Sequence, residues 1–280
     1  MAEITVAMIN DLRKQTSAGM MDCKRALNET NGDFTAAIKI LREKGAVIQQ
    51  KRADKESKQG IINVVASADG KTLALTEVNT ETDFVAKTDN FKNFALAVTN
   101  EVLAKGEDVA GSMNEALITI VSQTGENVKI RRTARMTLNG SGKVESYIHM
   151  GGKVGVLVEV ACGKAATESN EKFAQLVHDL TLQIAAAAPA YLVSAEVPAN
   201  VIDAEKDIYR NQLKGENKPE NIIENILKGK INKFFSEICL VNQPFVKEPK
   251  LNITDIVKAC EKECDDTIEI KKFVRFQLGA

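Results

Sequence analysis

The sequence lacks several features that would place it in a class at once. It has no tryptophan, and aromatic residues make up only 5% of its 280 residues, so side chains on which bases could stack are scarce. No run approaches the ~20 apolar residues that span a bilayer. The first residues also lack the basic start and apolar stretch of a signal peptide. We therefore expect a cytoplasmic protein without a membrane partner.

Neither sign of charge dominates. The 37 basic and 38 acidic residues give a net charge of -1, although residues 1–60 hold a small basic surplus, with 11 basic and 8 acidic side chains. A protein dedicated to nucleic acid usually carries a clear basic excess. We therefore expect no direct contact with nucleic acid.

Potential metal ligands and disulfide partners are few. Five scattered cysteines, an odd number, argue against a disulfide framework and for a reducing compartment. The two histidines, His149 and His178, are too distant in sequence for a zinc-type spacing. Cys260 and Cys264 lie four apart on one face of an expected helix, where a structural role is favoured over a metal site. We expect no metal and no cofactor.

The first 45 residues contain three short helical patterns. Apolar residues recur at helical spacing in 4–12 and again in 20–27. Asp33 is placed to cap a third helix, which we expect Gly45 to close. Residues 46–59 are rich in Lys, Gln, Asp and Ser, which is typical of a linker. We therefore predict a three-helix module followed by a linker.

From Gly60 the pattern changes to short strands and helices. A strand at 61–65 and a return strand at 73–78 flank Asp69-Gly70, a strong hairpin signal. Three more elements are expected, namely a helix from Asp89, a helix at 113–121 and a strand at 127–138. Together they predict a first α+β core subdomain at 60–140.

The same series of elements then recurs. Residues 152–160 echo 70–78 at an offset of 82, and Phe173-Ala174 echoes Phe94-Ala95 at an offset of 79. The strand at 128–138 aligns without gaps on 268–278, at an offset of 140. We infer a duplicated α+β core with antiparallel sheets, whose second copy carries an insertion of 61 residues between its helix and its last strand. The expected boundaries are 141–197 and 241–280 for the second subdomain and 198–240 for the insertion.

The insertion has a helical period of its own. Apolar residues recur at helical spacing on both sides of a polar turn at 215–218, which leads into Pro219 at a helix start. This pattern predicts an antiparallel, coiled-coil-like helical hairpin. A helical apolar stripe does not reveal what it faces, so the hairpin either protrudes or packs flat as core.

Two glycine motifs resemble nucleotide-binding loops and fail the test. Gly70-Lys71-Thr72 has Val65 where a phosphate-binding loop needs glycine, and it lies between two strands. Gly151-Gly152 is a hairpin turn rather than a dinucleotide fingerprint. No nucleophile at a recognisable spacing supports catalysis by His149, which is most simply a turn residue.

The segment Thr82-Asp83-Phe84-Val85 lies between a return strand and a helix. In one interpretation Asp83 caps backbone amides while Phe84 and Val85 staple the helix entry to the core. In the other, the segment is an exposed loop that presents a carboxylate beside a large apolar side chain. Chemistry alone favours the first interpretation.

Met20 and Met21 open the second helix. Two adjacent methionines cannot both face a three-helix core, so at least one is expected to be exposed, as suits a protein interface. Ordinary variation at a helix end is the alternative. Arg13, near the end of the first helix, is by default a solvated charge.

At this point the residues resemble a known family, translation elongation factor Ts. The similar stretches are TSAGMMDCKRAL at 16–27, TDFVAK at 82–87, GEN at 125–127 and QPFV with the following EP at 243–249. They occur in order over essentially the whole chain. The resemblance implies a ubiquitin-associated-like N-terminal module, a duplicated α+β core and a helical hairpin in its second half.

The resemblance also implies a function. Members are guanine-nucleotide exchange factors, not enzymes, for the GTPase elongation factor Tu. By position, Asp83 and Phe84 would enter the GTPase near its magnesium site, and Arg13, Met20, Met21 and His149 would be further contacts. Members often continue past the last strand into a C-terminal helix, whereas this sequence stops at Ala280.

Two other classes stay open from the residues alone. An enzyme would use Asp83 or His149 as general base, and a ubiquitin-binding adaptor would use the N-terminal module. A pull-down separates them, because an exchange factor retains the nucleotide-free GTPase and an adaptor retains ubiquitin chains. The sequence does not distinguish a one-to-one from a two-to-two complex, or show whether the hairpin dimerises.

Overall fold

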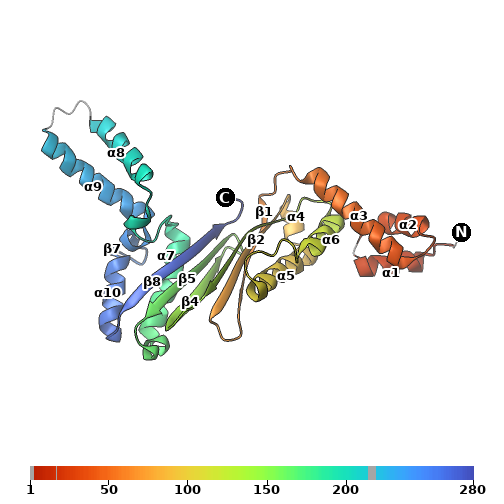
Figure 1. Cartoon of the computed structure of the whole chain (residues 1–280), viewed down its shortest axis with the longest axis horizontal. Coiled ribbons are helices and arrows are strands. Elements are labelled where there is room, and N and C mark those ends of the chain that lie inside the picture. The colour runs from red at the N-terminus through yellow and green to blue at the C-terminus, as the bar shows by residue number, and fades with distance from the viewer. Residues whose placement is uncertain (1–2, 17, 214–218) are drawn as a thin grey trace. The chain divides into compact units, whose positions relative to one another are not determined.

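The computed structural model describes residues 3–16, 18–213 and 219–280 as a mixed α+β chain (Figure 1). Its contacts divide it into two compact units. Unit 1 comprises Met1–Arg135, Ile148–Gly155 and Phe276–Ala280, and unit 2 comprises Met136–Tyr147 and Val156–Arg275. The predicted fold class is confirmed at this level.

Three helices open unit 1: α1 (Val6–Thr16), α2 (Met20–Glu29) and α3 (Phe34–Arg52). Their shared core includes Leu12, Cys23 and Leu27, all fully buried. Asp33 caps α3 as predicted, because its carboxylate accepts from the Ala36 amide at 3.0 Å. The three predicted helices are therefore present.

The predicted end of the third helix is wrong. α3 continues through Gly45 to Arg52, so half of the expected linker is helical. A Cβ at Gly45 would lie 2.7 Å from the Ile118 carbonyl oxygen, so this glycine permits close packing of α3 on helix α6 (Asn114–Thr124). Tight packing of this kind outweighs the helix propensity that glycine lacks, about 1 kcal/mol. Ile48 then packs against the core beneath the first sheet.

The first sheet has the order β1-β2-β3, from β1 (Gln59–Ala66), β2 (Thr72–Thr80) and β3 (Lys129–Thr137). β1 and β2 are antiparallel, with Ile62 opposite Glu77, and Gly70 turns between them at φ 69°. Helix α5 (Asp89–Lys105) covers β1 and β2 and buries Phe91 against them. The predicted hairpin, both helices and the third strand are confirmed.

The second sheet has the order β4-β5-β8, from β4 (Gly142–His149), β5 (Val154–Cys162) and β8 (Ile268–Gln277). Helix α7 (Glu171–Ala187) packs against α10 (Ile253–Cys264). The shorter elements are η1 (Ala165–Ser169), η2 (Ser194–Glu196), η3 (Leu240–Asn242), β6 (Pro244–Phe245) and β7 (Glu248–Asn252). All five cysteines are free thiols, and the sulfurs of Cys260 and Cys264 are 3.8 Å apart.

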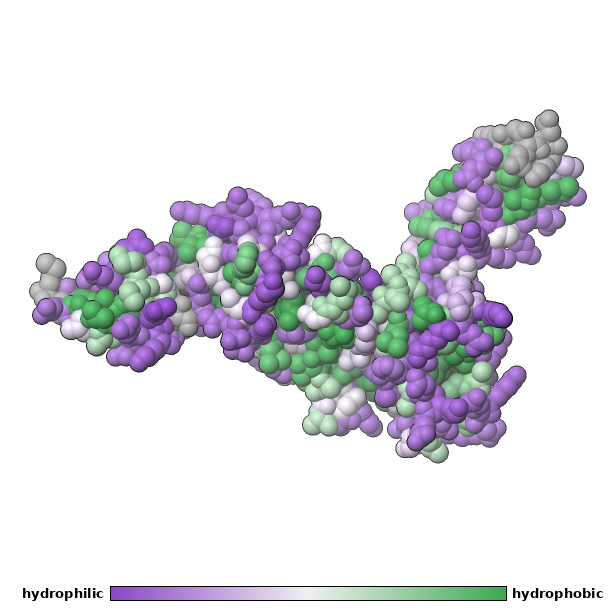
Figure 2. Space-filling model, turned by 180° about the vertical axis from the view of Figure 1, so that it is seen from behind, coloured by the Kyte–Doolittle hydropathy of each residue, from purple (hydrophilic) through white to green (hydrophobic). Residues whose placement is uncertain are grey.

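The inserted segment forms α8 (Ala199–Leu213) and α9 (Glu220–Ile238), which lie side by side (Figure 1). Their described buried residues are only Leu213, Leu227 and Ile231. Figure 2 accordingly shows apolar side chains among polar ones on the surface of this hairpin. The burial is that of two helices packed on each other, not of a segment laid flat as core. Pro219 precedes α9 as predicted, and the polar turn at 215–218 lies outside the described residues.

Two glycines make the same close approach in the two sheets. Gly60 is the second residue of β1, at φ 143°, and Gly142 is the first residue of β4, at φ 147°. A Cβ at Gly60 would lie 2.1 Å from the Val78 oxygen, and one at Gly142 would lie 2.2 Å from the Val160 oxygen. Only glycine fits such a position. Both pairs of equivalent residues are 82 apart, which is the offset found in the sequence.

In the described ranges, no helix combines the length and apolar composition that crossing a bilayer requires. The same residues contain no group of three or more His, Cys, Asp and Glu placed to hold a metal ion.

Candidate partner-binding site

The segment that resembles a family signature forms a four-residue helical turn, α4 (Asp83–Ala86), directly after β2. Thr82 is its N-cap, and the Thr82 hydroxyl accepts from the Val85 amide at 3.3 Å. The expectation that Asp83 caps the turn is therefore wrong. Asp83 is the first helical residue, and its side chain points to a different partner.

The turn exposes one apolar side chain and half-buries the next. Phe84 is 79% exposed, whereas Val85 and Ala86 pack against the core beneath the first sheet. The stapling interpretation thus holds for Val85 and fails for Phe84. Burial of a phenylalanine side chain would stabilise the fold by roughly 1.5–3 kcal/mol, a contribution that Phe84 does not make.

Asp83 is half-exposed and ion-paired. Its carboxylate accepts from the Lys87 ammonium at 2.5 Å, one helical turn further on. This hydrogen bond from Lys87 lowers the pKa of Asp83 below its ordinary value. The surface of α4 therefore carries an ionised carboxylate next to an exposed aromatic ring.

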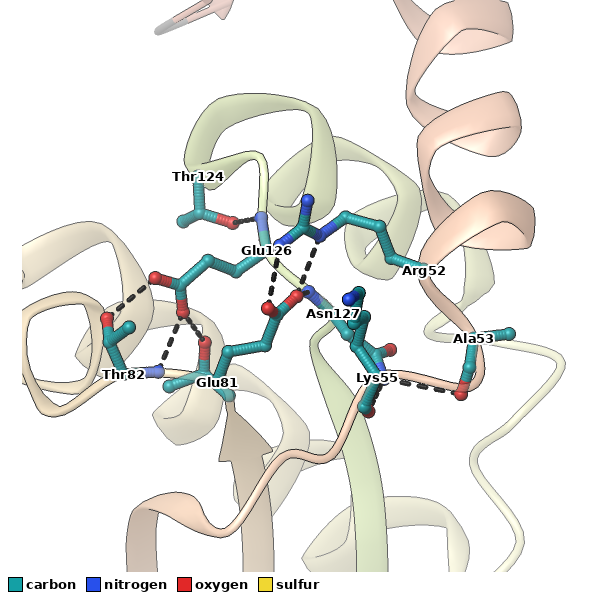
Figure 3. Close-up of polar contacts among 9 residues, drawn as sticks. Arg52, Ala53, Lys55, Glu81, Thr82, Thr124, Glu126 and Asn127 are labelled. Carbon is teal, nitrogen blue, oxygen red and sulfur yellow. Dashed lines mark hydrogen bonds and ion pairs between the residues drawn. The ribbon is translucent and has the colours of Figure 1, made fainter.

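A carboxylate from another part of unit 1 holds the residues before α4 (Figure 3). Glu126 accepts from the Thr82 amide at 3.0 Å, the Thr82 hydroxyl at 2.6 Å and the Thr80 hydroxyl at 2.7 Å. Glu126 follows Gly125, the left-handed C-cap of α6. The turn is thus fixed by a residue 44 positions away in the sequence.

A second carboxylate, Glu81, joins the end of α3 to the same place (Figure 3). It accepts from Nε and Nη2 of Arg52, both at 2.7 Å, and from the Asn127 amide at 2.6 Å. The Asn127 side chain donates to the Lys55 carbonyl at 2.7 Å. The hydrogen bond from Arg52 is the main reason that the pKa of Glu81 is lowered. Sequence reasoning missed both carboxylates, although GEN at 125–127 was a signal.

His149 ends β4 and is exposed on a tight turn, as predicted. Its carbonyl accepts from the Lys153 amide at 3.1 Å. The next residue, Met150, is 65% exposed at φ 50° and was missed by sequence reasoning. Gly152 holds this turn on β1, because its carbonyl accepts from the Ile62 amide at 2.8 Å. α4 also contacts β1, so one strand carries both features.

The other predicted contacts lie on the N-terminal helices. Arg13 is exposed near the end of α1. Met20 and Met21 are 49% and 64% exposed at the start of α2, so the expectation that at least one is exposed is confirmed. α1 and α2 pack on each other and on α3, whereas α4 packs on β1, β2 and α5. The predicted residues therefore form separate groups on unit 1.

Comparisons with known proteins agree along the whole chain. The family model "Elongation factor TS" matches residues 81–280, beginning at Glu81. The elongation factor Ts of Trichlorobacter lovleyi is 40% identical over 289 residues, which cover 99% of this chain and 93% of that protein. The elongation factor Ts of Nitratidesulfovibrio vulgaris is 40% identical over 276 residues, covering 99% and 96%. That of Clostridium perfringens is 39% identical over 287 residues. The chain therefore belongs to the elongation factor Ts family, the cytoplasmic, non-catalytic nucleotide exchange factors for elongation factor Tu in translation elongation.

Proposed function

We propose that the α4 turn carries the exchange step on elongation factor Tu. Phe84 acts as an apolar wedge, and Asp83 is the polar group that disturbs the surroundings of the magnesium ion. The single observation that carries this proposal is the 79% exposure of Phe84 on a turn that is itself held by hydrogen bonds. An aromatic side chain that contributes nothing to its own core is suited to a partner's pocket.

The proposed mechanism follows from how such GTPases hold nucleotide. A phosphate-binding loop and magnesium together neutralise the phosphates. A wedge that shifts these groups raises the free energy of bound GDP, and GDP then dissociates faster. The coupling is reciprocal, so nucleotide weakens binding of the factor by the same ratio. The factor therefore needs no catalytic group and only has to bind the empty GTPase far better than the loaded one.

Asp83 is able to change partners during this step. Its ion pair with Lys87 is solvent-exposed on both sides, and such pairs contribute little to stability. Exchange of Lys87 for a group of the GTPase therefore costs the factor little. The ionised state of Asp83 is the one that interacts with magnesium and its ligands.

We propose Arg13, Met20, Met21 and His149 as further contacts, and add Met150. Exposure supports them, since the two methionines of α2 and Met150 each present apolar surface to solvent. These contacts provide binding strength, whereas Phe84 and Asp83 act on the nucleotide site.

We also propose that the core is duplicated, with subdomains at 60–140 and at 141–197 with 241–280, and with 198–240 inserted into the second. The corresponding sheet orders and the shared glycine approach at an offset of 82 support this proposal. The three-helix module is the remaining part, and α3 extends beyond the expected limit at residue 45.

Release of a fluorescent GDP from elongation factor Tu tests the proposed function. Stopped-flow traces are recorded with excess unlabelled GDP, with and without the chain. We expect substoichiometric amounts of the chain to accelerate release, because each molecule acts repeatedly. A release rate equal to that of the GTPase alone would refute the exchange activity.

A further inference from the structure

The α4 turn is too short to hold its own shape. It has four residues, none of them fully buried, and a single helical turn is unstable in isolation because nucleation is unfavourable. Phe84 makes no use of the core, so its own packing does not set its direction. The direction of Phe84 therefore depends on what holds the backbone of the turn, which is the packing of Val85 and Ala86 on one side and the hydrogen bonds at the start of the turn on the other.

Two of the hydrogen bonds at the start of the turn are made by one hydroxyl group. The Thr82 hydroxyl donates its only proton to Glu126 at 2.6 Å and accepts from the Val85 amide at 3.3 Å. A hydroxyl has one donor and two acceptor lone pairs, so donation to Glu126 leaves a lone pair for that amide. Glu126 also holds the Thr82 amide at 3.0 Å. One carboxylate thus orients both the backbone and the capping side chain of α4.

Glu126 is itself held in place. Its amide donates to the Thr124 hydroxyl at 3.3 Å, and its neighbour Asn127 is buried and bonded to Glu81 and to the Lys55 carbonyl (Figure 3). Arg52 of α3 completes this support through Glu81. The carboxylate is therefore a rigid anchor rather than a mobile surface charge.

We infer that Glu126 is the positioning residue of the α4 turn, which sets the direction of Phe84 without touching the partner. The consequence for exchange rests on the function proposed above. The consequence for the order of the turn does not, and it is measurable on the free protein.

The first measurement is the 15N order parameter of the Phe84 and Val85 amides in the full chain. A rigid backbone gives about 0.85, and we expect Glu126→Ala to lower both amides below about 0.6. Glu126→Gln keeps one acceptor oxygen, so its order parameters should lie between those of the unmodified chain and those of Glu126→Ala. The matched control is Glu107→Ala, which removes a carboxylate that accepts from the Arg135 amide at 2.9 Å, elsewhere in unit 1, and should leave α4 rigid.

A second pair of variants covers the case in which Glu126→Ala does not fold. Thr82→Val removes the hydroxyl at nearly the same shape, and Thr82→Ser keeps it. We expect the order of α4 to be lost in the first and retained in the second. Unchanged order parameters in every folded variant that breaks the bonds to Glu126 would overturn the inference.

The second measurement is GDP release from elongation factor Tu over a range of factor concentrations. We expect the maximal rate with Glu126→Ala to fall about tenfold, while the half-saturating concentration changes less than about threefold, because the other contacts remain. A loosened turn with normal exchange would keep the positioning role and refute the proposed role of Phe84. A rigid turn with slow exchange would refute the positioning role of Glu126 and leave the proposed role of Phe84 standing.

Discussion

Glu77 of β2 is fully buried and is paired with Arg132 of β3, whose Nε donates to the Glu77 carboxylate at 2.8 Å. The Arg132 guanidinium also lies 4.6 Å from the centre of the Phe276 ring. The Gly279 amide donates to the other Glu77 oxygen at 2.9 Å. One buried carboxylate therefore joins two strands of the first sheet to the last residues of the chain.

Removal of Arg132 should destabilise the fold. Loss of one partner of a buried pair leaves the other charge uncompensated, at a cost of about 3–5 kcal/mol, and we expect the low end because Arg131 and Asn79 still contact Glu77. Urea unfolding of Arg132→Ala measures this. Arg131→Ala, whose contact is longer at 3.4 Å, is the comparison and should lose clearly less. If the two variants lost the same unfolding free energy, Arg132 would not be the more important partner of Glu77.

Phe84→Ala should slow exchange without changing stability. Truncation of a hot-spot residue costs ~2 kcal/mol or more, which corresponds to a roughly 30-fold slower GDP release. The melting temperature should barely move, because Phe84 is 79% exposed. Phe91→Ala is the matched control, since Phe91 is fully buried and its loss should destabilise by about 3–5 kcal/mol. A stability loss in Phe84→Ala with intact exchange would end its proposed role.

Asp83→Asn should also slow GDP release while stability stays the same. The change removes, at almost constant shape, the charge that we propose to act near magnesium, and the lost ion pair with Lys87 is exposed. The lowered pKa keeps Asp83 ionised at neutral pH, so the difference from the unmodified chain should not vary between about pH 6 and 8. Lys87→Met is the control for loss of the pair alone. If Lys87→Met slows GDP release as much as Asp83→Asn does, the effect comes from loss of the Asp83–Lys87 ion pair and not from the charge of Asp83.

The stabilising effect of Glu81 should disappear in acid. Its pKa is lower in the folded chain than the ordinary value of 4.5, so its contribution is complete above that value. The contribution declines as the pH falls through 4.5 towards the folded pKa. The difference in unfolding free energy between the unmodified chain and Glu81→Gln, measured by urea titration, should be constant from pH 7 to about 5 and then shrink. A difference that grew in acid would contradict the assignment to the Arg52–Glu81 pair.

Replacement of both Met20 and Met21 by alanine should weaken binding more than it slows the exchange step. Both side chains are largely exposed and far along the chain from α4, so their contacts are made equally before and during nucleotide displacement. Removal of uniform binding raises the half-saturating concentration and leaves the maximal rate. GDP release over a concentration series measures the two quantities separately. A lower maximal rate at unchanged half-saturation would show that α2 acts on the nucleotide site.

Much of the chain was predictable because the deciding signals are local. The hairpin around Asp69-Gly70 and the helix from Asp89 follow from turn chemistry and apolar spacing over a few residues. The offset of 82 between repeated segments also lies in the sequence, and the matching close approaches at Gly60 and Gly142 agree with it. The candidate turn itself was located from its residues and from its resemblance to the family.

Other features depended on packing between distant segments. Glycine is typical of the residue that ends a helix, yet Gly45 lies inside α3, because its lack of a side chain permits the close approach of α6. Asp83 has the composition of a cap, yet Thr82 takes that role because Glu126 orients its hydroxyl from 44 residues away. The sequence by itself determined which elements form and where the candidate turn with Phe84 lies, because those signals span a few residues. Only the tertiary structure decided where α3 ends and which carboxylate bonds to Thr82 before the turn, because both depend on atoms that are brought together by folding.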